Sequence, residues 1–224
     1  MGLHLIIGNK NYSSWSFRPW LAMKVAGIAF EETVISLDAP DFKTRVIASG
    51  GSGRVPVLID GETCIWESLA IIEYLAEKFP TVGLWPREAQ VRAHARAIAC
   101  EMHAGFLPLR RRLPMNVWRP VLPRALDDQA VANVARIEAI WSECRRRFGT
   151  AGPFLYGTFG AADAMYAPMV WRFHTYGVEV GPVAHAYMGA IMELPAWNEW
   201  RAAALREPWV LAEDEVDWPD VKRQ

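Results

Sequence analysis

The chain has 224 residues, of which 52% are hydrophobic and 12% aromatic, enough apolar material for one large core or two smaller ones. Its 24 basic and 25 acidic residues leave a net charge of −1, which excludes a global attraction to nucleic acid or to anionic membranes. Three widely spaced cysteines without a CxxC pair indicate free thiols in a reducing compartment, so we expect a cytoplasmic protein. No apolar run reaches the ~18 residues of a membrane span, so we expect no membrane partner.

The first 35 residues alternate between strand and helix signals. Residues 3–7 and 30–35 are apolar or β-rich runs that predict strands. Between them, Pro19 suits the first turn of a helix that begins near Phe17 and stops at Gly27. A strand, a helix and a strand of this length predict a βαβ unit with parallel strands.

The stretch from 54 to 79 predicts a hairpin followed by a helix. Residues 55–59 and 63–66 are strand-like, and Asp-Gly at 60–61 favours a tight turn between them. Apolar residues at i, i+3, i+4 and i+7 over 72–79 predict one buried helix face, and Pro80 ends the helix. The segment before this hairpin, 36–53, is expected to be irregular, with one short helix over 42–47.

Two features of this stretch suit a peptide-like ligand. Glu67 and Ser68 fall at a helix N-terminus, where free N–H groups and the helix dipole could hold a carboxylate. Pro56 cannot donate a ladder hydrogen bond, which suggests a turn or a cis linkage and leaves the Val55 backbone free to pair with a ligand. The alternatives are that Ser68 is only a helix cap and Pro56 only opens a strand.

Beyond a turn-rich linker at 80–86, the strand pattern disappears. Helices separated by Pro and Gly signals are predicted at 87–112, 123–148, 160–176, 183–192 and 195–206. The acidic tail after Glu207 is expected to pack back on the surface without regular structure. We therefore predict an α/β domain at 1–80 and an all-helical domain at 87–224.

Several other chemistries are excluded by spacing. GGSGR at 50–54 precedes a strand and lacks the Lys-Ser/Thr pair of a phosphate-binding loop. The five histidines show no metal-ligand spacing, and no GxSxG elbow is present, so neither a metal nor a hydrolase triad is expected. The arginine clusters at 110–112 and 145–147 are typical of solvated helix faces, although one arginine of the first could face a cleft and meet an anionic substrate.

Four motifs in order resemble one known family. They are SSWSFR at 13–18, RVP at 54–56, ES at 67–68, and GAAD at 160–163 followed by Pro168. Together they are similar to the cytosolic glutathione S-transferases, nearest the serine-type theta and zeta classes. The resemblance covers nearly the whole chain.

The resemblance implies a thioredoxin-like N-terminal domain joined to an all-α domain, with glutathione as cosubstrate in the cleft between them. It implies a detoxifying transferase, active as a homodimer, that conjugates glutathione to small electrophiles. The implied glutathione contacts are Trp15, Arg54, Val55, Pro56, Glu67 and Ser68. The implied acceptor pocket is Met102, His103, Phe106 and Arg110. The alternatives are a glutathione-dependent peroxidase or isomerase, and a non-catalytic protein that binds glutathione or a partner in the stress response.

Two departures argue against maleylacetoacetate isomerisation. Zeta isomerases carry Cys where this chain has Trp15, and an arginine late in the helix after GAAD where this chain has Thr175. A third departure, Gly160 in place of a capping Ser or Thr, is harmless because Gly is a tolerated N-cap.

The implied catalytic residue is Ser13 or Ser14. A free thiol with pKa about 8.5 is only about 3% thiolate at pH 7, so an enzyme that uses it must stabilise the anion. A serine O–H donated at a helix N-terminus can do so. Counting back from Arg18 aligns Ser14 with the theta-type serine and Ser13 with the cysteine of thiol-type relatives, and we favour Ser14. The alternative is that both serines only cap the helix.

Overall fold

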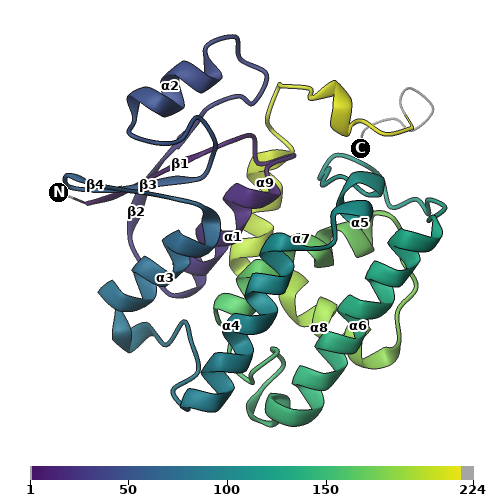
Figure 1. The fold of residues 1–224 in the computed structure, drawn as a ribbon. Coiled ribbons are helices and arrows are strands. Elements are labelled where there is room, and N and C mark those ends of the chain that lie inside the picture. Colours follow the sequence, from purple (N-terminus) through teal and green to yellow (C-terminus); the bar gives the residue numbers. More distant parts are fainter. Residues whose placement is uncertain (1, 218–224) are drawn as a thin grey trace.

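Four short strands form one mixed sheet in the order β2-β1-β3-β4. They are β1 (Leu3–Ile7), β2 (Phe30–Val34), β3 (Val57–Asp60) and β4 (Thr63–Trp66). β1 runs parallel to β2 and antiparallel to β3, and β3 pairs antiparallel with β4. The computed structural model describes residues 2–217 (Figure 1), and it confirms the parallel βαβ unit and the hairpin.

The helices of this domain are α1 (Ser14–Val25), α2 (Phe42–Ala48) and α3 (Ser68–Lys78). α1 begins at Ser14 rather than near Phe17, because the Ser13 side chain caps it by accepting the Ser16 N–H. Pro19 therefore lies inside the helix.

The strand predicted from residue 55 is also corrected. β3 starts only at Val57, and Val55 and Pro56 form the turn before it, joined by a cis peptide bond. The Val55 backbone is thus outside the ladder of the sheet, where a ligand can pair with it.

The second domain is helical. Its helices are α4 (Ala89–Ala104), α5 (Leu107–Arg112), α6 (Asp128–Phe148), α7 (Ala161–Thr175), α8 (Pro182–Met192) and α9 (Pro195–Ala204). The single helix predicted at 87–112 is wrong: Phe106 adopts the left-handed conformation (φ 61°) and separates α4 from α5. The helix predicted from 123 begins at Asp128, because Asp127 caps it by accepting the Ala130 N–H. These two domains confirm the predicted fold class, while their boundaries at 80 and 87 stay predictions.

α7 is the centre of the molecule. Nearly all its residues are buried, and it packs against α1 of the first domain and α4 of the second (Figure 1). One continuous apolar core runs through both domains. Since α7 packs against α1, its side chains lie beside the N-terminus of α1.

The segment after α9 returns to the first domain, as predicted for the tail. The Glu207 carboxylate accepts the backbone N–H groups of Lys10 and Asn11 at 2.6 and 2.9 Å, and the Tyr12 hydroxyl donates to Glu215 at 2.5 Å. The expectation that the tail has no regular structure is wrong, because a short 3-10 turn, η3 (Ala212–Asp214), lies within it. The end of the predicted second domain, 218–224, lies outside the described residues.

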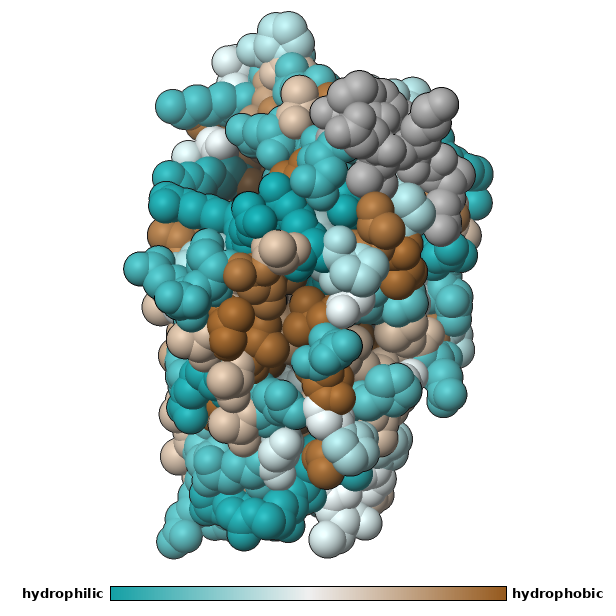
Figure 2. All heavy atoms as spheres, turned by 90° about the vertical axis from the view of Figure 1, so that its right-hand side faces the viewer, coloured by the Kyte–Doolittle hydropathy of each residue, from teal (hydrophilic) through white to brown (hydrophobic). Residues whose placement is uncertain are grey.

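The face formed by the helical domain is mixed in polarity. Figure 2 shows apolar side chains gathered near its middle and hydrophilic ones toward its ends. The exposed large apolar residues of α5, α6 and the connection between them are Leu107, Val121, Leu122 and Val131. Over residues 2–217, no helix combines the length and the apolar character that a membrane crossing requires.

Candidate active site

Two cavities adjoin between the domains. The turn cavity, of about 250 Å³, is lined by Trp15, Ser52, Arg54, Val55, Pro56, Trp66, Glu67 and His103. The serine cavity, of about 350 Å³, is lined by Tyr12, Ser13, Ser14, Trp15, Leu37, Phe42, Arg54, Val55, Arg110, Pro114, Met115, Arg172, Leu211, Glu213 and Asp214. Trp15, Arg54 and Val55 line both, so the two cavities form one cleft with two compartments.

The two candidate serines have different surroundings. The Ser13 hydroxyl donates to the Ser16 hydroxyl at 2.7 Å, and its oxygen accepts the Ser16 N–H at 3.4 Å. Ser14 is the first residue of α1, and its oxygen accepts from Arg172 Nη2 at 3.4 Å. The Ser13 hydroxyl is therefore used inside the fold, whereas the Ser14 hydrogen is free to point into the serine cavity.

Two arginines and a histidine surround Trp15. The guanidinium carbons of Arg18 and Arg110 lie 4.2 and 4.3 Å from its ring centroid, and the His103 ring meets it edge-on at 5.2 Å. Burial lowers the pKa of His103, with the Glu67 carboxylate opposing and Arg18 and Arg110 reinforcing the shift. His103 is therefore neutral near pH 7.

Of the arginines at this site, Arg18 and Arg172 are buried and Arg110 is half-buried. Burial, followed by repulsion from Arg110 and Arg172, lowers the pKa of Arg18. Burial and the Arg110 charge lower the pKa of Arg172 to about 10, so it stays protonated at neutral pH. Within residues 2–217, none of Arg18, Arg110 and Arg172 has a carboxylate within 4.0 Å. A cation taken out of water without a counter-charge is costly. The serine cavity, which Arg110 and Arg172 line, is therefore electrostatically suited to an anion.

The acidic turn η3 closes one side of the serine cavity. Burial raises the pKa of Asp214 to about 6, against the opposing effect of the Arg172 charge and with a reinforcing effect of Glu213. Asp214 therefore carries only part of a full negative charge near pH 6, and the cleft keeps an excess of positive charge.

The N-terminus of α3 borders the turn cavity. Glu67 is exposed, adopts a positive φ of 74°, and has its carboxylate 3.8 Å from His103 Nε2. Ser68 is the first residue of α3, and its hydroxyl is buried without a hydrogen-bond partner among the described residues. Ser68 follows Glu67 in the chain, but it is not itself among the residues that line the turn cavity.

The expected acceptor pocket is only partly assembled. Met102 and Phe106 are 0% and 7% exposed and belong to the core. Neither lines the turn cavity or the serine cavity, so the structure does not place them in the expected acceptor pocket. Arg110 lines the serine cavity, but His103 lines the turn cavity.

Sequence reasoning missed Arg172. The clue was a single charged residue in the otherwise apolar run of 164–173. It lies three positions before Thr175, on the same face of α7. The chain thus has an arginine one turn before the position where zeta isomerases carry theirs.

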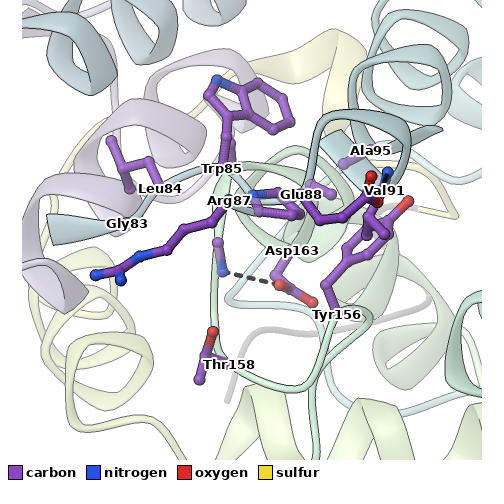
Figure 3. A pocket seen from close by; sticks show the side chains of 14 residues that line it. Gly83, Leu84, Trp85, Arg87, Glu88, Val91, Ala95, Tyr156, Thr158 and Asp163 are labelled. Carbon is purple, nitrogen blue, oxygen red and sulfur yellow. Dashed lines mark hydrogen bonds between the residues drawn. The ribbon is translucent and has the colours of Figure 1, made fainter. Parts of the chain in front are cut away.

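A third cavity, of about 330 Å³, lies where the interdomain linker meets α4 and α7. Figure 3 shows Trp85, Tyr156 and Asp163 on its wall. The buried Asp163 carboxylate accepts the N–H of Leu155 at 3.0 Å and the N–H of Gly160 at 2.9 Å. The second of these bonds is the dashed line in Figure 3. None of the expected site residues lines this cavity. The Asp163 carboxylate on its wall holds backbone N–H groups just before the start of α7.

No metal centre is formed by the described part of the chain, 2–217, where no group of three or more His, Cys, Asp or Glu side chains could hold an ion.

Comparison with family models matches both domains. Residues 12–78 match the glutathione S-transferase N-terminal domain, and residues 103–203 match the glutathione S-transferase C-terminal domain. The chain is 30% identical to Glutathione S-transferase 1 of Dianthus caryophyllus over 70% of its length and 72% of the relative. It is 27% identical to Maleylpyruvate isomerase of Ralstonia sp over 89% of its length and 98% of the relative.

Another relative is matched over less than half its length. The chain is 36% identical to Probable maleylacetoacetate isomerase of Caenorhabditis elegans over 43% of its length and 45% of the relative.

Solved structures share the fold. A glutathione transferase homolog from Burkholderia, with bound glutathione, is 21% identical with a TM-score of 0.68, and the match covers 92% of this chain and 100% of that one. The nitrogen regulation fragment of the yeast prion protein Ure2p is 18% identical with a TM-score of 0.69, covering 92% and 97%.

Proposed function

The chain belongs to the glutathione S-transferase family, and on this premise we propose that it is a glutathione transferase acting on small electrophiles. The observation that carries the proposal is the cleft with two compartments that share Trp15, Arg54 and Val55. Glutathione occupies the turn cavity and the electrophile the serine cavity. The thiol proton is released to solvent, the thiolate sulfur forms a C–S bond, and the leaving group departs with the bonding electrons.

Glutathione has a defined orientation in this proposal. Its cysteinyl backbone pairs with Val55, which precedes the cis peptide bond to Pro56. Its γ-glutamyl carboxylate lies at the N-terminus of α3 beside Ser68, with the amino group near Glu67. The unpartnered Ser68 hydroxyl supports this placement, since a buried polar group without a partner is costly.

Ser68→Ala tests this placement. We expect glutathione binding to weaken by about 1–3 kcal/mol, because a hydrogen bond to a charged group is lost. Titration calorimetry on the purified protein measures the affinity. Ser49→Ala is the matched control, since Ser49 is half-buried outside the cleft and its hydroxyl donates to the Arg45 carbonyl of α2. A protein that binds no glutathione at millimolar concentration would contradict the whole proposal, whereas an unchanged Ser68→Ala affinity would contradict only the placement.

A second candidate is glutathione-dependent isomerisation of an anionic substrate. It is favoured by Arg110 and Arg172, which present unpaired positive charge to the serine cavity, and by the similarity to Maleylpyruvate isomerase. Trp15 and Thr175 argue against the zeta reaction, but Arg172 supplies a cation one turn from Thr175.

A substrate panel separates these candidates. Aryl halides, epoxides, hydroperoxides and maleyl compounds are each incubated with the protein and glutathione. Conjugation consumes glutathione in proportion to product, isomerisation regenerates it, and peroxide reduction yields glutathione disulfide. Inactivity on every compound by a protein that binds glutathione would favour a binding role such as regulation.

The homodimer, the cytoplasmic location and the detoxifying role stay predictions. Sedimentation in solution tests the first, because a homodimer has twice the 25.2 kDa mass of the chain.

A further inference from the structure

The hydroxyl of Ser14 is held by a residue from the other domain. Arg172 on α7 donates through Nη2 to Ser14 Oγ at 3.4 Å. Its Nε donates to the Leu113 carbonyl at 2.8 Å, and its Nη1 to the Pro168 carbonyl at 3.2 Å. Two backbone carbonyls therefore fix the planar guanidinium, and the Nη2 that remains faces Ser14.

This contact constrains where the Ser14 hydrogen points. A guanidinium has donors and no acceptor, so Ser14 Oγ must accept from it and cannot donate to it. The nearby Ser14 carbonyl already accepts from Arg18 Nη1 at 2.9 Å. The open direction for the hydrogen is the serine cavity, which both Ser14 and Arg172 line.

We infer that Arg172 is a positioning residue that orients the Ser14 hydroxyl so that its hydrogen meets the glutathione sulfur. The inference rests on the proposed function. The Arg172 cation also polarises the Ser14 O–H bond, which makes the hydroxyl a better donor to an anion.

Other charges face the same cavity and could act on the sulfur directly. They are Arg54 before β3, Arg110 on α5, and Glu213 and Asp214 in η3, while Arg18 on α1 is fully buried and lines neither cavity. A test must therefore separate action through Ser14 from the direct field of Arg172.

A double-mutant cycle makes this separation. The pKa of the thiol of bound glutathione is titrated by thiolate absorbance in the unaltered protein, Arg172→Met, Ser14→Ala and the double variant. We expect Arg172→Met alone to raise the thiol pKa by about one unit. In the Ser14→Ala background, we expect the same substitution to raise the thiol pKa by less than about a third of a unit. Equal shifts in both backgrounds would show a direct field and overturn the inference, and so would the absence of any shift.

Two further variants secure the result. Arg172→Lys keeps the charge but not the planar fork, so we expect a rise in thiol pKa that again depends on Ser14; this variant carries the test if Arg172→Met does not fold. Arg136→Met is the matched control, because Arg136 is exposed and pairs with Glu101, and its thiol pKa should not change.

The proposed function can fail separately. An unaltered protein that binds glutathione with an ordinary thiol pKa of about 8.5 would overturn the thiolate mechanism, and this inference with it. A lowered thiol pKa with additive variants would overturn this inference alone.

Discussion

Replacing Ser14 with alanine is expected to raise the pKa of the bound glutathione thiol by about one to two units and to slow conjugation about tenfold at pH 7. A hydrogen bond to a charged group contributes about 1.5–3 kcal/mol, and one pKa unit corresponds to about 1.36 kcal/mol. Glutathione affinity should change little, because the peptide contacts lie in the turn cavity. Thiolate absorbance and steady-state rates measure the two effects.

Ser13→Ala is the matched control for that experiment. Ser13 caps α1 and its hydroxyl donates to Ser16, so its removal should cost about 1 kcal/mol of stability and leave the thiol pKa unchanged. If instead Ser13→Ala moved the thiol pKa and Ser14→Ala did not, the assignment would have to be reversed. If neither variant moved it, the serine mechanism would be wrong.

Replacing Asp163 with alanine is expected to lower the free energy of unfolding by about 3 kcal/mol. The change leaves the buried N–H of Leu155 and the part-buried N–H of Gly160 without their acceptor, and an unsatisfied buried group costs about 1–3 kcal/mol. Urea denaturation measures the loss. Asp128→Ala is the control, because Asp128 is exposed in the first turn of α6 and should cost at most about 0.5 kcal/mol. An Asp163→Ala loss equal to that of the control would contradict the role assigned to this carboxylate.

The same residue predicts a pH dependence. Burial raises the pKa of Asp163 from 3.8 to about 6, against the opposing effect of its two N–H donors. Because the folded pKa lies above the unfolded value, the stabilisation is full below about pH 4 and is lost as pH rises through about 6. The stability of the unaltered protein relative to Asp163→Asn should therefore fall by about 3 kcal/mol between pH 4 and 7. A difference that stays constant or grows with pH would show that the two donors outweigh burial.

Local patterns in the sequence were enough to predict the two domains. The strand and helix periods of the first 80 residues, the hairpin signal at Asp60 and Gly61, and the Pro and Gly breaks of the second half each act over a few residues. The turn or cis linkage predicted at Pro56 is confirmed as a cis peptide bond. It could be predicted because cis peptide bonds occur almost only before proline.

Element boundaries were less well predicted. The α4–α5 break at Phe106 needs a left-handed residue that is not glycine, and no turn motif announced it. The start of α1 at Ser14 depends on which serine caps the helix. The Ser16 hydroxyl that accepts from Ser13 also accepts the N–H of Gly8, a contact across the loop that the local pattern does not reveal.

The candidate cleft divides in the same way. Sequence alone determined that serines, a cis-proline turn and a helix N-terminus occur in the first domain, because these features are local. Only the tertiary structure decided that Arg172 meets Ser14 across 158 positions of chain, that Met102 turns into the core, and that Arg18 and Arg110 share the ring of Trp15. Helical spacing determines which side chains share a face of α7, but only the packing of α7 against α1 determines that this face meets Ser14. In the same way, the sequence contains the arginines, but only their burial in the folded protein shows that they lack carboxylate partners among the described residues.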